Sequence, residues 1–154
     1  MKHIGHIVGI LIVTAFFVLL VYFQGEFLDR NQPQLPDGIT PQQWIGSFIG
    51  WAQICVVSAA IASFLWYGLA QWVFKIRKWE DTEKRPWWIA LCILPLAAII
   101  ASCIFVKRAE DGLRLEQCIF FLINGLLSYY ISTVLFSPSS FKYTPVLAKR
   151  IRYW

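Results

Sequence analysis

Two of the four cysteines in this 154-residue sequence are placed so that they could form a disulfide. Cys103 lies one turn inside the end of one apolar segment, and Cys118 stands at the start of the next. In a helical hairpin both would lie at the same depth, and a bridge would add about 3 kcal/mol in the chain-entropy model. Two free thiols that pack as small apolar groups are the alternative. Because the sequence has no C-x-x-C pair, it counts against a thiol oxidoreductase.

A second set of polar side chains recurs on one side of the last apolar segment. Asn124, Ser128 and Ser132 are spaced four residues apart and therefore share a helix face, with Gly125 beside them. Neutral polar and small residues on one face commonly hold membrane helices together, at about 0.6 kcal/mol per hydrogen bond. The same face could instead line the pore of a self-associating channel or small transporter. We expect helix packing.

Metal, haem and acid–base chemistry have few candidate residues. The only histidines, His3 and His6, precede the first apolar segment, and two ligands without further partners make a poor metal site. No ionisable acid, base or histidine lies deep in an apolar segment, where a proton-coupled transporter needs one. The sequence therefore predicts no catalytic, cofactor-binding or metal-binding site, and no enzyme.

The elements that must position these side chains are four long apolar segments. Hydrophobic residues make up 58% of the chain and charged residues 15%, against about 25% charged in ordinary soluble domains. Each of the four charge-free runs supplies the roughly 20 residues that cross a bilayer. The first run exceeds the apolar stretch of a signal peptide and lacks its cleavage pattern, so we expect a retained helix. The predicted fold is an all-α, polytopic membrane protein, an antiparallel bundle of four transmembrane helices at about residues 7–23, 44–74, 86–106 and 117–136, in a single domain (1–154) with a basic tail (137–154).

The distribution of lysine and arginine predicts the orientation of the bundle. The three loops hold one, five and three basic residues in turn, and the tail holds four. Basic loops stay in the cytoplasm, so both termini are expected there. Chain size and charge bias favour a bacterial inner membrane, with an organelle membrane as the alternative. The tryptophans expected at the inner interface, where indole rings favour the headgroup level, are Trp72, Trp79, Trp87, Trp88 and Trp154.

The second helix has a clear start and an unusual length. Thr40 is an N-cap residue, Pro41 suits the first helical position, and Gln43 stands where a capping box needs it. From Pro41 to Phe74 a continuous helix would be about 51 Å long, against about 30 Å of hydrocarbon. The helix is therefore expected either to project from the membrane or to bend before Trp51.

The third helix contains Pro95 near its middle. A proline there removes one backbone hydrogen bond and usually kinks the helix. We expect a bend near residues 93–96.

A small-residue pattern on the second helix predicts close packing against another helix. Gly46 and Gly50 form a G-x-x-x-G, and Ala59 with Ser63 continues a small-x-x-x-small spacing. Small residues let a second backbone approach closely. The expected partner is a second copy of the chain or another membrane protein.

The chain ends in a basic, aromatic tail that is predicted to form a short interfacial helix. Thr144 and Pro145 repeat the cap-then-proline start, and Leu147 begins an apolar face. A basic face could also recruit an acidic cytoplasmic partner. So few charges beside a membrane are ordinary positive-inside signal, which argues against nucleic acid. The residues expected to contact the membrane or a partner are Lys142, Lys149, Arg150, Arg152 and Trp154.

Taken together, these features predict a non-catalytic integral subunit of a multi-protein membrane assembly, of the secretion, transfer or defence type. The expected partners are the lipid bilayer and other membrane subunits or copies of the chain itself. The channel or transporter lined by the Asn124 face is one alternative. A thiol- or quinone-linked membrane oxidoreductase is a further alternative, and it would need Cys103 and Cys118 to cycle.

Overall fold

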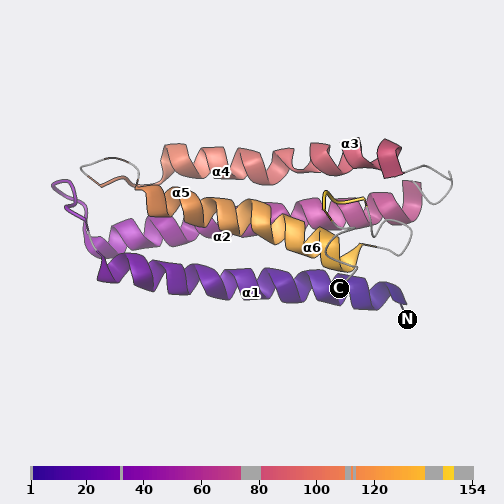
Figure 1. Cartoon of the computed structure of the whole chain (residues 1–154). Coiled ribbons are helices and arrows are strands. Elements are labelled where there is room, and N and C mark those ends of the chain that lie inside the picture. Colours follow the sequence, from indigo (N-terminus) through magenta and orange to yellow (C-terminus); the bar gives the residue numbers. More distant parts are fainter. Residues whose placement is uncertain are drawn as a thin grey trace.

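The structure is built from long helices that lie side by side along a common axis (Figure 1). The computed structural model describes residues 2–31, 33–73, 81–109, 112, 114–137 and 144–147, and this part of the chain holds no strand beyond an isolated bridge between Ala109 and Gly112. The predicted all-α class is confirmed. In chain order the elements are α1 (Lys2–Arg30), α2 (Pro41–Gly68), η1 (Leu69–Val73), α3 (Asp81–Leu91), α4 (Ile93–Phe105), α5 (Leu115–Leu122), η2 (Ile123–Leu127) and α6 (Ser128–Phe136).

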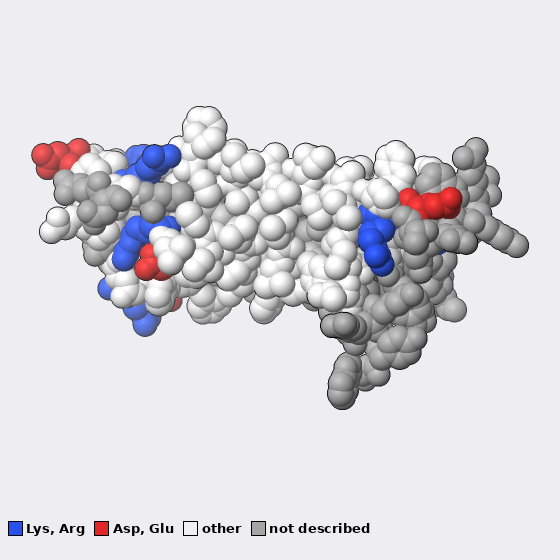
Figure 2. Space-filling model, turned by 45° about the horizontal axis from the view of Figure 1, so that its top comes forward, with Lys and Arg blue, Asp and Glu red and all other residues white. Residues whose placement is uncertain are grey.

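Four helical stretches are long and apolar enough to cross a membrane, and each overlaps one predicted segment. They span Ile4–Arg30, Pro41–Val73, Glu83–Phe105 and Leu115–Phe136. Figure 2 shows that Lys, Arg, Asp and Glu gather at the two ends of the molecule, with an uncharged belt between them. Large apolar side chains are exposed along all four stretches, as the hydrocarbon of a bilayer requires. The chain is therefore a membrane protein with a helical bundle.

The second long helix begins where its cap residues predict. The Thr40 hydroxyl accepts a hydrogen bond from the Gln43 backbone N–H at 3.3 Å, and Pro41 occupies the first turn. The helix is then α-helical without interruption to Gly68, so the alternative of a bend before Trp51 is wrong. It continues as the π-helical turn η1, which gives a helical stretch of 33 residues.

The third long stretch is interrupted at Cys92, one residue before the predicted bend. Pro95 cannot donate to the Leu91 carbonyl, and its ring crowds that carbonyl, so the α-helical ladder breaks at this turn. The Cys92 N–H bonds instead to the Ile89 carbonyl at 3.0 Å, and the regular pattern resumes when Leu96 N–H bonds to the Cys92 carbonyl at 3.1 Å. The proline explains the break, and α3 and α4 are the two halves.

Two clusters of buried side chains join the helices. In the larger cluster Phe48 of α2 stacks on Phe121 of α5, with ring centroids 5.5 Å apart. In the smaller cluster Trp88 of α3 stacks on Tyr129 of α6, also at 5.5 Å. Offset aromatic pairs add about 0.5–1.5 kcal/mol beyond their burial. These stacks fix the level of α5 and α6 relative to α2 and α3.

Candidate functional site

A pair of side-chain amides forms a buried polar contact between two helices of the described structure. Asn124 Nδ2 donates to Gln24 Oε1 at 2.7 Å, and Gln24 Nε2 donates to Asn124 Oδ1 at 3.4 Å. Gln24 lies in α1 and Asn124 in η2, and their side chains are 6% and 0% exposed. Along α1 the charged residue nearest Gln24 is Glu26, two residues further on, and along the fourth stretch the charged residue nearest Asn124 is Glu116, eight residues earlier or about 12 Å of helix.

Backbone irregularity brings Asn124 to this position. Residues Ile123–Leu127 form a single π-helical turn, a rare element that recurs at functional positions in helices. Gly125 follows Asn124 and faces α4: a Cβ at this position would lie 2.8 Å from Ile99 Cδ1 and 3.6 Å from the Pro95 carbonyl oxygen. A side chain here would have to displace the end of the Ile99 side chain, so glycine favours the close approach of η2 to α4. The amide pair and the proline break thus meet in one layer of the bundle.

The remaining residues of the polar stripe also face the interior. Ser128 and Ser132 are buried with Asn124, under α1 and α2 of the same chain. A pore lined by this face would require the bundle to open. The sequence pattern identified the shared face but missed Gln24, whose only signal was a polar side chain near the end of an apolar run.

A second hydrogen-bonded cluster lies near the other end of the bundle. Trp88 Nε1 donates to Thr133 Oγ1 at 3.0 Å, and the Tyr129 hydroxyl donates to the Trp88 carbonyl at 2.9 Å. Trp66 Nε1 donates to Ser137 Oγ at 2.9 Å. These bonds tie α2 and α3 to α6, and they give each indole and hydroxyl a partner away from water.

Two buried polar side chains have no hydrogen-bond partner among the described residues. They are Trp44, at its indole Nε1, and Gln117, at both amide atoms. Each lies four residues before a member of the stacked pair Phe48 and Phe121, so the two share one level near the start of α2 and α5. A buried donor or acceptor without a partner costs about 1–3 kcal/mol.

The cysteines are free thiols distributed through the bundle. Cys103 and Cys118 are neighbouring free thiols at the shared depth that the hairpin geometry predicts. Cys55 is fully buried, and its Sγ lies 3.2 Å from Ser102 Oγ. Cys103 and Cys118 are therefore adjacent and unbridged in the described structure.

The predicted small-residue pattern of α2 divides between two faces. Ala59 and Ser63 are buried in the core, and the Ser63 hydroxyl donates to the Ala59 carbonyl at 2.8 Å. Gly46 and Gly50 face outward, and a Cβ at either would meet nothing within 4 Å. A groove of about 390 Å³ continues from Gly50 along the outer face, lined by Gly50, Gln53, Ile54, Val57, Ser58 and Ile61.

The tail is described only in part. Residues 144–147 form a turn in which Leu147 has a φ of 64°, so the helical start predicted at Thr144 and Pro145 is not seen. The other tail residues expected to contact the membrane or a partner lie outside the described residues: Lys142, Lys149, Arg150, Arg152 and Trp154.

No group of three or more His, Cys, Asp or Glu within the described ranges could hold a metal ion. Comparison of the chain with models of known protein families, with curated proteins and with solved structures found no match. The function therefore has to be inferred from the chain's own geometry.

Proposed function

We propose that this chain is a non-catalytic integral subunit of a multi-protein membrane assembly, of the secretion, transfer or defence type. It would act through helix packing and through a basic cytoplasmic face. Several buried polar side chains of the described interior form bonds between helices, such as that between Gln24 and Asn124. Such bonds serve assembly of the bundle and leave its outer faces for partners.

The observation that carries this proposal is the outer face of α2. Glycine in a helix interior is less favourable than alanine by about 0.8–1.0 kcal/mol. At Gly125 this is offset by contact with α4, whereas Gly46 and Gly50 have open space where a Cβ would stand. Two exposed glycines one turn apart let another backbone approach, and the adjoining groove extends that surface.

We further propose an antiparallel bundle with both termini in the cytoplasm, in a bacterial inner membrane. Contacts between opposite ends of the helices support it: Gly9 of α1 lies against Phe136 of α6, and Gln53 of α2 donates to the Tyr22 hydroxyl of α1 at 3.1 Å. The excess of basic residues in the second loop and the tail supports the orientation. Single cysteines placed by Asp37→Cys and Lys78→Cys should react with an impermeant thiol reagent from opposite sides. Labelling from one side would refute the topology.

The test of the function is solubilisation in mild detergent, native gel separation and mass spectrometry of what migrates with the chain. We expect a large species that contains other membrane proteins. The double variant Gly46→Leu/Gly50→Leu should dissociate this species while the chain itself stays folded. Gly5→Leu is the matched control, because Gly5 is also an exposed helical glycine with open space around it.

Two results would overturn the proposal. One is a single species at a small multiple of 17.8 kDa, which would favour self-association alone. The other is an assembly that survives the double variant as well as it survives Gly5→Leu.

A further inference from the structure

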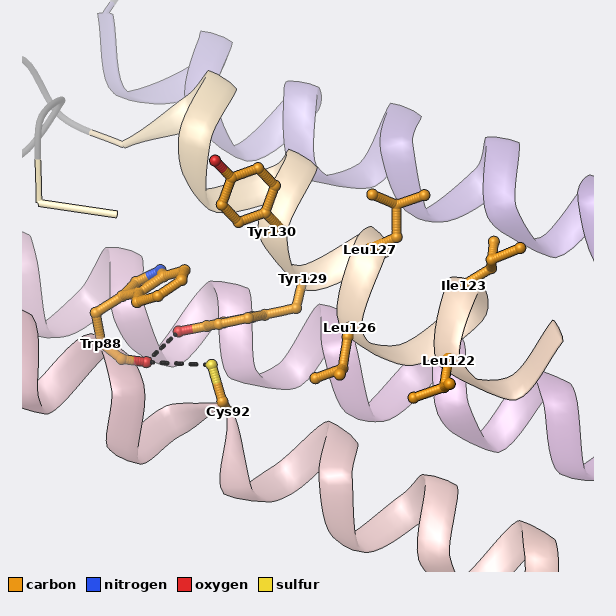
Figure 3. A pocket seen from close by; sticks show the side chains of 8 residues that line it. All are labelled: Trp88, Cys92, Leu122, Ile123, Leu126, Leu127, Tyr129 and Tyr130. Carbon is orange, nitrogen blue, oxygen red and sulfur yellow. Dashed lines mark hydrogen bonds between the residues drawn. The ribbon is translucent and has the colours of Figure 1, made fainter. Parts of the chain in front are cut away.

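A wholly apolar groove opens between the third and fourth long helices. Its volume is about 450 Å³, within the range of ligand pockets in proteins. Figure 3 shows the side chains around it: Trp88 and Cys92 on one side, and residues of α5, η2 and α6 on the other. The lining residues are Trp88, Cys92, Leu122, Ile123, Leu126, Leu127, Tyr129 and Tyr130.

The groove lies at the helix break. Trp88 lies in the last turn of α3 and Cys92 is the break itself, so the groove borders the part of the third stretch where the α-helix is interrupted. On the other side it follows the π-helical turn η2. From Leu122 to Tyr130 it extends about 12 Å along the fourth stretch, at 1.5 Å per residue.

The walls favour a thin, flexible occupant over a helix. Apart from Cys92, each lining residue is a large aliphatic or aromatic side chain. Membrane helices approach one another over small residues, so walls of this kind keep a second backbone away. Water is also excluded, since it needs polar partners that these walls do not present. A hydrocarbon chain meets both conditions.

One end of the groove carries a cation. Arg85 precedes Trp88 by three residues and Cys92 by seven, so all three share one face of the third stretch. Two hydrogen bonds with the turn at residues 144–147 indicate that Arg85 and the groove residue Tyr130 lie at the same end. Arg85 Nε donates to the Thr144 carbonyl at 3.5 Å, and the hydroxyl of Tyr130 donates to the Val146 carbonyl at 2.7 Å.

Arg85 has donors to offer an anion. Its side chain is exposed, and the hydrogen bond described for it uses only Nε, one of five N–H groups. A guanidinium binds a phosphate through paired hydrogen bonds.

We propose that this groove binds one anionic phospholipid of the bilayer, with an acyl chain against Leu122 and Leu126 and the phosphate at Arg85. The groove is separate from the Gly46 and Gly50 face, so the lipid-binding proposal does not depend on the proposed assembly.

The test is native mass spectrometry of the full chain in mild detergent, with phosphatidylglycerol or phosphatidylcholine of identical acyl chains. We expect phosphatidylglycerol to be retained preferentially. Arg85→Gln should reduce this preference about fivefold, since a basic residue near headgroups contributes about 1 kcal/mol.

Leu122→Trp narrows the groove and should lower retention of phosphatidylglycerol more than about tenfold, because displacing two methylenes loses about 1.6 kcal/mol. Leu19→Trp is the matched control, since Leu19 is an exposed leucine of α1, on a different helix. As a second readout, phosphatidylglycerol with a photoactivatable acyl chain should crosslink to residues 122–130. The variant Leu122→Trp should abolish that crosslink.

Equal retention of the two lipids would overturn the proposal. So would retention and crosslinking that Leu122→Trp leaves unchanged, or purification of the chain with a neutral isoprenoid or a protein segment in the groove instead.

Discussion

The amide pair of Gln24 and Asn124 gives the sharpest prediction about stability. Replacing Asn124 by leucine removes both hydrogen bonds, at 2.7 and 3.4 Å, and leaves the Gln24 amide buried without a partner. Hydrogen bonds between membrane helices average about 0.6 kcal/mol and reach about 1.7 kcal/mol. An unsatisfied buried amide adds about 1–3 kcal/mol. We therefore expect Asn124→Leu to lower the free energy of unfolding by about 2–3 kcal/mol.

The double variant separates the bond from the bulk of the side chain. In Gln24→Leu/Asn124→Leu neither amide remains to be satisfied, and replacing both partners by apolar groups is often close to neutral. The loss in the double variant should thus be smaller than the sum of the single losses, by about 1–2 kcal/mol of coupling.

The assay is equilibrium unfolding in mixed micelles with increasing SDS, followed by the fluorescence of the eight tryptophans. The control is Thr14→Val in α1, which removes a hydroxyl bonded only to the Ile10 carbonyl of its own helix at 2.9 Å. Single losses that simply add, to within about 0.3 kcal/mol, would refute the pairing of Gln24 with Asn124.

Three further changes test other parts of the structure. Gly125→Ala should destabilise the bundle by about 1–3 kcal/mol, because the added Cβ would lie 2.8 Å from Ile99 Cδ1. Gly50→Ala should be neutral or stabilising in the same unfolding assay, because a Cβ at Gly50 would meet no atom within 4 Å. Gln117→Leu should raise the free energy of unfolding by about 1–3 kcal/mol, since it removes two buried atoms without partners; a loss of stability would show that Gln117 is satisfied in the membrane. Mild oxidation should link Cys103 to Cys118 and stabilise the chain by about 3 kcal/mol. The bridge should appear as a mobility shift on non-reducing gels, and Cys103→Ser should abolish that shift. An unshifted band would show that the thiols cannot reach bonding geometry.

Much of the architecture could be predicted from the sequence because it depends on local properties. The charge-free runs give the four helical stretches, the Thr40 cap gives the start of α2, and Pro95 gives the break to within one residue. Each of these signals is contained in a few consecutive residues, and the energy of burying charge or breaking a hydrogen bond in lipid makes them strong.

The interior contacts could not be predicted in the same way. Helices in lipid are apolar all round, so the pattern that marks the buried face of a soluble helix is weak, and Gln24 carried no sign of its partner 100 residues away. The π-helical turn at Asn124 packs against α2 and α4, and these contacts are not recorded in the local composition. The groove beside Cys92 depends on how far two helices diverge after the break, which is a property of the whole bundle.

The length of α2 has a consequence for the bilayer itself. The stretch from Pro41 to Val73 has 33 residues and the fourth stretch has 22, or about 50 Å and 33 Å of helix in one bundle. A bilayer can accommodate such a mismatch by thickening locally, which costs fractions of a kcal/mol per ångström of mismatch. The elastic penalty falls in thicker regions of the membrane, so the chain should partition toward them. Two molecules that share one thickened annulus of lipid would also attract each other before any of their side chains touch.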